Sequence, residues 1–237
     1  MIVKVGKAVF ETTAVLAVLC VACAGVAQDR SGSYPGMASL DKYLMTDRNA
    51  EITLAQSAAP DHNATVMILG SDGYEAAVNG SNGFVCEVER GWMSPFDSPE
   101  FWNPKMRGPI CFNPQAARSI LPITIERTKL VLAGRTKDQI MADIRRDLDS
   151  KKLPALEPGA MSYMLSPKSN LGDAVGHWIP HLMFYVAVSQ ANSWGADLPG
   201  SPVMRNPQFN RAPEPITVFM IPAKTWSDGT PAPPDKN

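Results

Sequence analysis

Sequence motifs that identify common catalytic or nucleotide-binding sites are absent from this chain. It holds no nucleophile elbow, no P-loop and no dinucleotide-binding glycine fingerprint. Histidine and cysteine are scarce, with three and four copies in 237 residues, and Cys20 and Cys23 lie in an apolar N-terminal stretch. No standard motif therefore assigns a reaction, and the cofactor is unknown at this level.

An excess of basic residues is also absent. Removal of residues 1–27 leaves 20 basic and 22 acidic residues, a net charge of −2, and no basic run occurs. Proteins that bind nucleic acid neutralise phosphates with clustered lysine and arginine. We therefore expect no nucleic-acid partner, and a small molecule or another protein as the partner instead.

A hydrophobic run long enough to span a membrane is lacking as well. The chain begins with Lys4 and Lys7, continues with an apolar stretch over 14–27, and offers small residues for cleavage. This order is typical of a secretory signal peptide, and the apolar stretch is shorter than the ~20 residues that a spanning helix needs. The sequence predicts a signal peptide over 1–27 and a secreted or periplasmic protein. An uncleaved leader or a lipid on Cys23 is the alternative, and only these would attach the chain to a membrane.

Two cysteines, Cys86 and Cys111, remain after the predicted cleavage. An exported protein with two thiols most simply pairs them. The bond would close a loop of 25 residues and stabilise the fold by about 3.5 kcal/mol on the chain-entropy model. A free nucleophilic cysteine is the alternative, and no local motif supplies the base that it would need.

The rest of the chain is long enough for one domain with a real core, because 45% of all residues are apolar. We predict a flexible linker over 28–38, a single α+β domain over 39–226 and a disordered, proline-rich tail over 227–237. The fold class expected is an antiparallel sheet of about six strands in two meanders, with helices packed on one side and a long loop rich in proline and aromatics.

Periodicity locates the expected elements. Helical spacing predicts helices over 39–60 and 136–153, and Thr136 and Gln139 form a capping box at the start of the second. The "NGSNG" stretch over 79–83 predicts a hairpin between two strands. Alternating or continuous apolar residues predict strands at 65–69, 74–78, 84–90, 160–165, 181–188 and 216–223.

The strand over 84–90 alternates clearly between apolar and acidic residues. Cys86 and Val88 are expected on one face, and Glu87 and Glu89 on the other. Such alternation is typical of an antiparallel sheet with one face on the core and one in water. The sequence therefore predicts that Cys86 is buried and that both glutamates are solvated.

Residues 91–114 contain five prolines and five aromatic residues. This proline density argues against regular strands, and a long ordered loop in a domain is often functional. Aromatic rings next to carboxylates are typical of the floor of a small-ligand site. The alternative is that the rings only cover the end of the sheet. The candidate ligand-binding residues of this loop are Trp92, Phe96, Asp97, Glu100 and Trp102.

His177 and His181 raise a second hypothesis, a metal site. Pro180 excludes a helix through this segment, and in a straight strand the two rings would lie about 13 Å apart. Only a bend would bring them together, with Asp173 as a third ligand. Zinc is the first choice, and copper is less favoured. Copper is considered because nearby thioethers are present at Met161, Met164 and Met183.

The alternative for these histidines is an ordinary polar role at a strand end, or acid–base chemistry without metal. Two functions from different classes therefore remain open. The first is an exported, non-enzymatic module that binds a ligand or partner through the aromatic loop. The second is a metal-dependent hydrolase centred on Asp173, His177 and His181.

Overall fold

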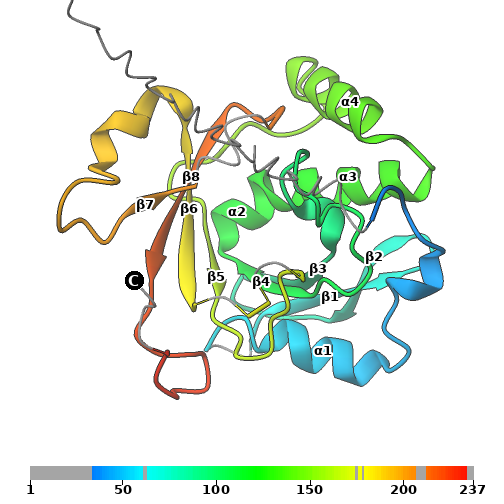
Figure 1. Cartoon of the computed structure of the whole chain (residues 1–237), viewed down its shortest axis with the longest axis horizontal. Helices are drawn as coiled ribbons and strands as arrows, with labels where there is room; N and C mark the ends of the chain where they lie inside the picture. The colour runs from blue at the N-terminus through cyan, green and yellow to red at the C-terminus, as the bar shows by residue number, and fades with distance from the viewer. Residues whose placement is uncertain (1–33, 61–62, 174–175, 178, 207–211, 234–237) are drawn as a thin grey trace, which may run out of the picture. The chain divides into compact units, whose positions relative to one another are not determined.

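The structure is a computed structural model that describes residues 34–60, 63–173, 176–177, 179–206 and 212–233 (Figure 1). The predicted signal peptide over 1–27 lies outside the described residues, as does the linker segment 28–33. Within the described ranges, no helix combines the length and apolar character needed to cross a membrane.

Eight strands form one mixed sheet in the order β2-β1-β3-β4-β5-β6-β8-β7. Neighbouring strands are antiparallel, except that β1 and β3 run parallel. The α+β class is confirmed, whereas the prediction of a six-stranded antiparallel sheet in two meanders is wrong in detail. The strands are β1 (Thr65–Gly70), β2 (Gly73–Val78), β3 (Val85–Glu89), β4 (Gly108–Phe112), β5 (Met161–Met164), β6 (His181–Ala187), β7 (Met204–Arg205) and β8 (Ile216–Pro222).

The first departure from the prediction is strand β4, which lies inside the proline-rich segment 91–114. β4 pairs with β3 along its whole length, but it pairs with β5 only at Cys111 and Phe112. Pro109 therefore sits where β4 has a ladder neighbour on one side only. A residue without an N–H is tolerated at such an edge-like position.

The second departure is that β2 and β3 do not form the predicted hairpin. The connecting segment 79–84 instead passes close to the backbone before β1, where Ser81 N–H donates to the Asn63 carbonyl over 2.9 Å. A Cβ on Gly80 would lie 2.2 Å from the backbone nitrogen of Thr65, so only glycine allows this approach. The close passage places β3 on the far side of β1, parallel to it.

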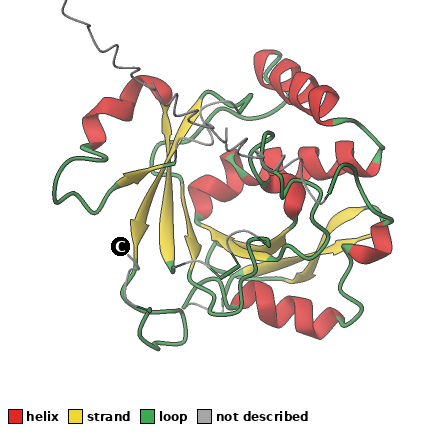
Figure 2. Cartoon of the chain, in the orientation of Figure 1, coloured by secondary structure: helices red, strands yellow, loops and turns green. Residues whose placement is uncertain are grey.

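Helices lie on both faces of the sheet, and the prediction that they pack on one side is wrong (Figure 2). On β4, Cys111 packs in one cluster with Ala55 of α1, whereas Ile110 and Phe112 pack with Ala116 of α2. Alternate residues of a strand point to opposite faces, so α1 and α2 cover different faces. The α-helices are α1 (Arg48–Gln56), α2 (Pro114–Ser119), α3 (Leu121–Leu132) and α4 (Lys137–Asp149), and the 3₁₀-helices are η1 (Leu40–Lys42), η2 (Gly91–Met93) and η3 (Val188–Trp194).

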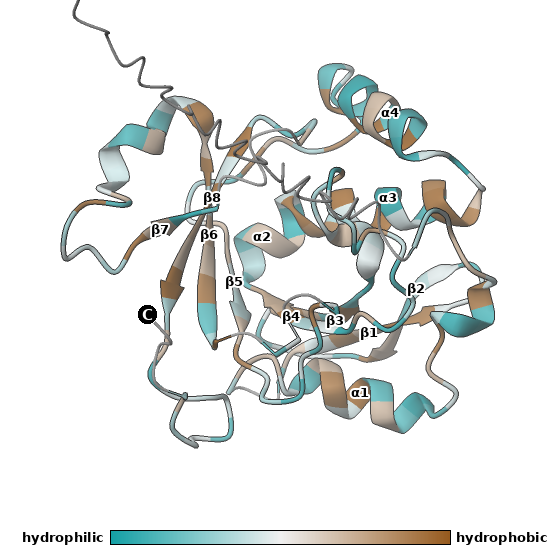
Figure 3. Ribbon diagram, viewed as in Figure 1, coloured by the Kyte–Doolittle hydropathy of each residue, from teal (hydrophilic) through white to brown (hydrophobic). Residues whose placement is uncertain are grey.

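Helix boundaries follow local capping. The predicted helix over 39–60 is split into η1 and α1, because Asp47 caps a new helix by accepting hydrogen bonds from the backbone of Asn49 and Ala50. The capping box of Thr136 and Gln139 at the start of α4 is confirmed. Hydrophobic and hydrophilic residues alternate along α1 and α4, as expected for helices with one face on the core (Figure 3).

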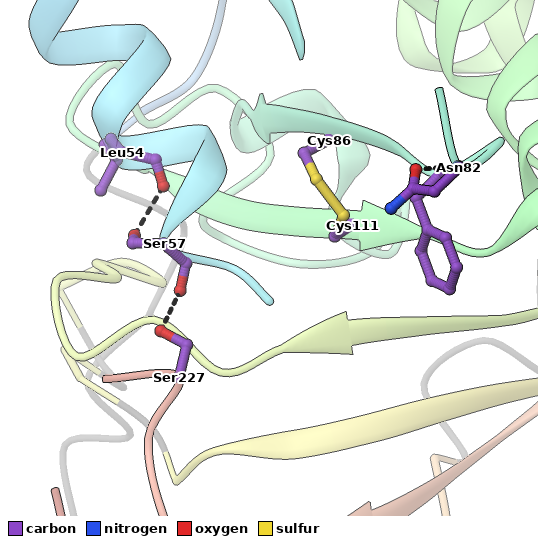
Figure 4. The surroundings of a disulfide bond; sticks show 7 residues. Leu54, Ser57, Asn82, Cys86, Cys111 and Ser227 are labelled. Carbon is purple, nitrogen blue, oxygen red and sulfur yellow. Dashed lines mark hydrogen bonds between the residues drawn. A yellow bond between two sulfur atoms is a disulfide. The ribbon is translucent and has the colours of Figure 1, made fainter. Parts of the chain in front are cut away.

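The predicted disulfide between Cys86 and Cys111 is confirmed (Figure 4). The two cysteines are direct partners in the β3–β4 ladder, with their Cα atoms 4.0 Å apart. Near the bond, Ser227 Oγ donates to the carbonyl of Ser57 over 2.6 Å. Ser227, the first residue of the predicted tail over 227–237, thus contacts the end of α1.

Candidate functional site

The face of β3 opposite the disulfide carries two carboxyl groups into the interior. Glu87 is 0% exposed, and Glu89 is partly buried. The prediction that this face meets water is wrong, because a second helical layer lies over it: α2 packs on the same face of the sheet and α3 packs against β2. Among the described residues, neither carboxylate oxygen of Glu87 has a hydrogen-bond partner.

Burial sets the protonation of both groups. It raises the pKa of Glu87 well above its ordinary value, and the neighbouring charge of Glu89 adds to this effect. Burial also raises the pKa of Glu89 to about 8, although the positive charge of Arg127 opposes the shift. An ionised carboxylate is poorly solvated in such surroundings. At neutral pH Glu89 is therefore mainly a neutral carboxylic acid that can donate a hydrogen bond.

Helix α3 contributes two polar side chains to the same region. Thr124 and Arg127 are three residues apart, so they share one face of the helix, and they are 1% and 4% exposed. Arg127 Nη2 donates to Glu214 Oε1 over 3.0 Å, which forms a buried ion pair. Within the described part of the chain, the hydroxyl of Thr124 and the Nε–H of Arg127 have no hydrogen-bond partner.

These side chains meet at a small space, here named the inner cavity, with a volume of about 70 Å³. A cavity of this size has room for more than one water molecule, or for a small group of a ligand. Its apolar walls come mainly from α3 and the strands β6 and β8. The lining residues are Glu89, Met93, Ile120, Ile123, Thr124, Arg127, Met183, Tyr185, Ala212, Glu214, Ile216 and Val218.

A larger depression, here named the outer groove, adjoins the inner cavity and has a volume of about 480 Å³. Four residues line both spaces: Ile120, Ile123, Glu214 and Ile216. The groove runs between the start of α3, the end of α4 and the segment before β8. Most of its walls are apolar, and the remaining lining residues are Ser119, Arg145, Leu148, Asp149, Lys151, Leu153, Pro154, Ala155, Leu156, Ala187, Pro213 and Pro215.

The aromatic rings predicted to form a ligand site lie mostly in the core. Trp92 and Trp102 are 0% and 7% exposed, and both belong to a hydrophobic cluster with residues of α3 and α4. Phe96 is half-buried against this cluster, Asp97 is exposed, and Glu100 is buried and accepts from Asn103 Nδ2 over 2.6 Å. The structure therefore does not gather these five side chains around one open surface.

The aromatic loop nevertheless shapes the site through its backbone. The carbonyls of Trp92 and Ser94 accept from Arg127 Nη1 over 3.3 and 3.5 Å. The ring of Phe96 lies 4.4 Å from the guanidinium carbon of Arg127, close enough for a cation–π contact. The side chain of Met93 lines the inner cavity. The loop thus holds Arg127 in place.

The three candidate metal ligands have separate surroundings. Asp173 is exposed and accepts from Tyr34 Oη over 2.6 Å. His177 Nδ1 lies 3.1 Å from the Ser169 carbonyl, whereas His181 is buried, with Nδ1 2.8 Å from the Ile179 carbonyl. In the described ranges, no group of three histidine, cysteine or acidic side chains is placed to hold a metal ion.

Sequence reasoning missed the residues that do converge: Thr124, Arg127, Glu214 and the interior position of Glu89. Arg127 and Glu214 are far apart in the sequence, and no motif links them. The local sequence of residues 124–134, which contain Arg127, is compatible with either a helix or a strand and gives no clear signal of a site. Comparison with protein-family models, with curated proteins and with solved structures found no match.

Proposed function

We propose that this chain is an exported binding module that holds a small apolar ligand in the outer groove and receives the ligand's polar end in the inner cavity. The observation that carries the proposal is an apolar groove of about 480 Å³ that adjoins a buried polar cluster. Ligand pockets commonly measure about 300–1,000 Å³ and combine apolar walls with a few placed polar groups. The aromatic loop takes part by fixing Arg127.

Export is part of the proposal. Disulfides persist in oxidising compartments and are rare in the cytosol, so the Cys86–Cys111 bond supports a secreted or periplasmic location. The sequence of residues 1–27 supports it independently through its signal-peptide pattern. Sequencing the N-terminus of the mature protein from an exporting host tests this part, and an intact Met1 would contradict it.

A titration with N-phenyl-1-naphthylamine, a neutral fluorescent apolar dye, tests binding in the groove. Ala155 lines the groove at an exposed position outside any helix or strand, so Ala155→Trp should obstruct the groove without disturbing the fold. We expect saturable binding of one dye per chain and a loss of affinity of about tenfold or more in this variant.

The matched control is Ala76→Trp, which adds the same ring at an exposed position of β2 that does not line the groove. This control should bind the dye like the wild type. Absence of saturable binding to the folded protein, or the same affinity in both tryptophan variants, would overturn the proposal.

A further inference from the structure

The inner cavity collects hydrogen-bond donors that lack acceptors. The Nε–H of Arg127 and the hydroxyl of Thr124 are buried and unpaired among the described residues, and both side chains line the cavity. Glu89 lines the same cavity, and its raised pKa leaves a carboxylic acid O–H there at neutral pH. Because buried polar groups are nearly always hydrogen-bonded, unpaired donors on side chains that line one space indicate that an acceptor belongs beside them.

The charges of the cavity decide which acceptor fits. The positive charge of Arg127 is already balanced by Glu214, with which it forms an ion pair of 3.0 Å. A ligand carboxylate would bring a second negative charge beside Glu214, and the described residues that line the cavity offer no second cation to pair with it. Burial of an unpaired charge is much more costly than burial of a hydrogen-bonded neutral group. An uncharged oxygen acceptor is therefore favoured.

We propose that the inner cavity binds the uncharged carbonyl oxygen of a ligand, such as a ketone, ester or amide, whose apolar chain lies in the outer groove. This inference rests on the proposed function and specifies its ligand. The carbonyl oxygen has two lone pairs and accepts from Arg127 Nε–H and from Thr124 Oγ1–H, and Glu89 lines the same cavity. Three isoleucines that line both spaces, Ile120, Ile123 and Ile216, form the apolar path for the chain.

Calorimetric titration with three ligands of one chain length tests the proposal: 2-octanone, octanoate and octylammonium. We expect 2-octanone to bind at least about tenfold more tightly than either ion, which corresponds to one good hydrogen bond without a buried charge. Thr124→Val removes the hydroxyl and preserves the shape of the side chain. This variant should weaken 2-octanone about fivefold to tenfold, and its thermal midpoint should stay or rise because the hydroxyl lacks a partner.

Further variants separate the donors. Arg127→Lys keeps a cation for Glu214 but removes the Nε–H, so it should also weaken 2-octanone. Glu89→Gln keeps an uncharged donor and should retain the wild-type affinity within about threefold. The matched control is Thr53→Val, which removes a hydroxyl that bonds only within α1, with Thr53 Oγ1 donating to Asn49 over 2.8 Å. It should leave all three affinities unchanged.

The outcomes distinguish this inference from the proposed function. Equal binding of the three ligands, unaffected by Thr124→Val, would overturn the carbonyl inference and leave the groove as an apolar binding site. Tighter binding of octanoate or octylammonium would overturn it in favour of a charged ligand. Absence of binding by all three would overturn both proposals.

Discussion

Arg127 and Glu214, which are 87 residues apart in the sequence, form a buried ion pair with 4% and 6% of their side chains exposed. The pair joins α3 to the segment that leads into β8, and both residues line the inner cavity. Two backbone carbonyls of the aromatic loop accept from the same guanidinium. The contacts of Arg127 therefore bring three parts of the chain together at the proposed ligand site: α3, the segment before β8 and the aromatic loop.

Removal of either partner should be strongly destabilising. Glu214→Leu or Arg127→Met leaves one buried charge unpaired, and we expect each to lower the free energy of unfolding by about 3–5 kcal/mol. The double variant leaves no unpaired charge and should be more stable than the sum of the single effects by about 2 kcal/mol. Urea denaturation of the four proteins measures this coupling, and strictly additive effects would show that the two side chains do not interact.

The interior position of Glu89 predicts a specific pH dependence of stability. Its folded pKa of about 8 lies above the ordinary value of 4.5, so the folded state holds a proton that the unfolded chain releases. The stabilisation from this proton is complete below pH 4.5 and is lost as the pH rises to about 8. Relative to Glu89→Gln, the wild type should lose stability over this window by less than about 1.4 kcal/mol per pH unit.

Urea denaturation of the wild type and of Glu89→Gln at several pH values checks this slope. The comparison cancels groups that titrate alike in both proteins. A stability difference between the wild type and the variant that stays constant between pH 5 and pH 8 would contradict this prediction and would mean that Glu89 is solvated in the folded protein.

The disulfide should make a large contribution to stability. Replacement of both Cys86 and Cys111 by alanine is expected to lower the free energy of unfolding by about 3.5 kcal/mol, because the bond closes a loop of 25 residues. A thiol count on the denatured, unreduced mature protein should find none. Two free thiols per chain would refute the bond.

Gly80 should be intolerant of any side chain. A Cβ at this position would lie 2.2 Å from the backbone nitrogen of Thr65, so Gly80→Ala should destabilise the protein by about 2 kcal/mol or more. Gly36→Ala is the control, since a Cβ there meets nothing within 4 Å, and it should change stability by less than about 0.5 kcal/mol. Equal stability of the two variants would mean that the segment between β2 and β3 does not pass this close to the backbone of Thr65.

Features set by local chemistry could be predicted from the sequence. The capping box of Thr136 and Gln139 depends on residues three apart, and six predicted strands match β1, β2, β3, β5, β6 and β8. The pairing of Cys86 with Cys111 followed from there being only two candidates. Strand β4 was missed because Pro109 is acceptable only where one side of the strand lacks a neighbour, which depends on the length of β5.

The candidate site could not be predicted, because it depends on what covers each face of the sheet. The alternation of Val88 with Glu87 and Glu89 is the same whether the acidic face meets water or a second helical layer. Aromatic residues such as Trp92 and Trp102 are common in binding surfaces, but here both side chains are buried in the core. Arg127 and Glu214 are 87 residues apart, and only the tertiary fold brings them together.

Methyl NMR of the protein labelled at isoleucine tests the central claim, that a ligand lies between α3 and the start of β8. During a titration with 2-octanone, the methyl signals of Ile120, Ile123 and Ile216 should shift together and saturate, because these side chains line both spaces. The signals of Ile52 and Ile68, which pack on the opposite face of the sheet with α1, should not move. Shifts confined to Ile52 and Ile68, or no shifts at saturating ligand, would contradict this account.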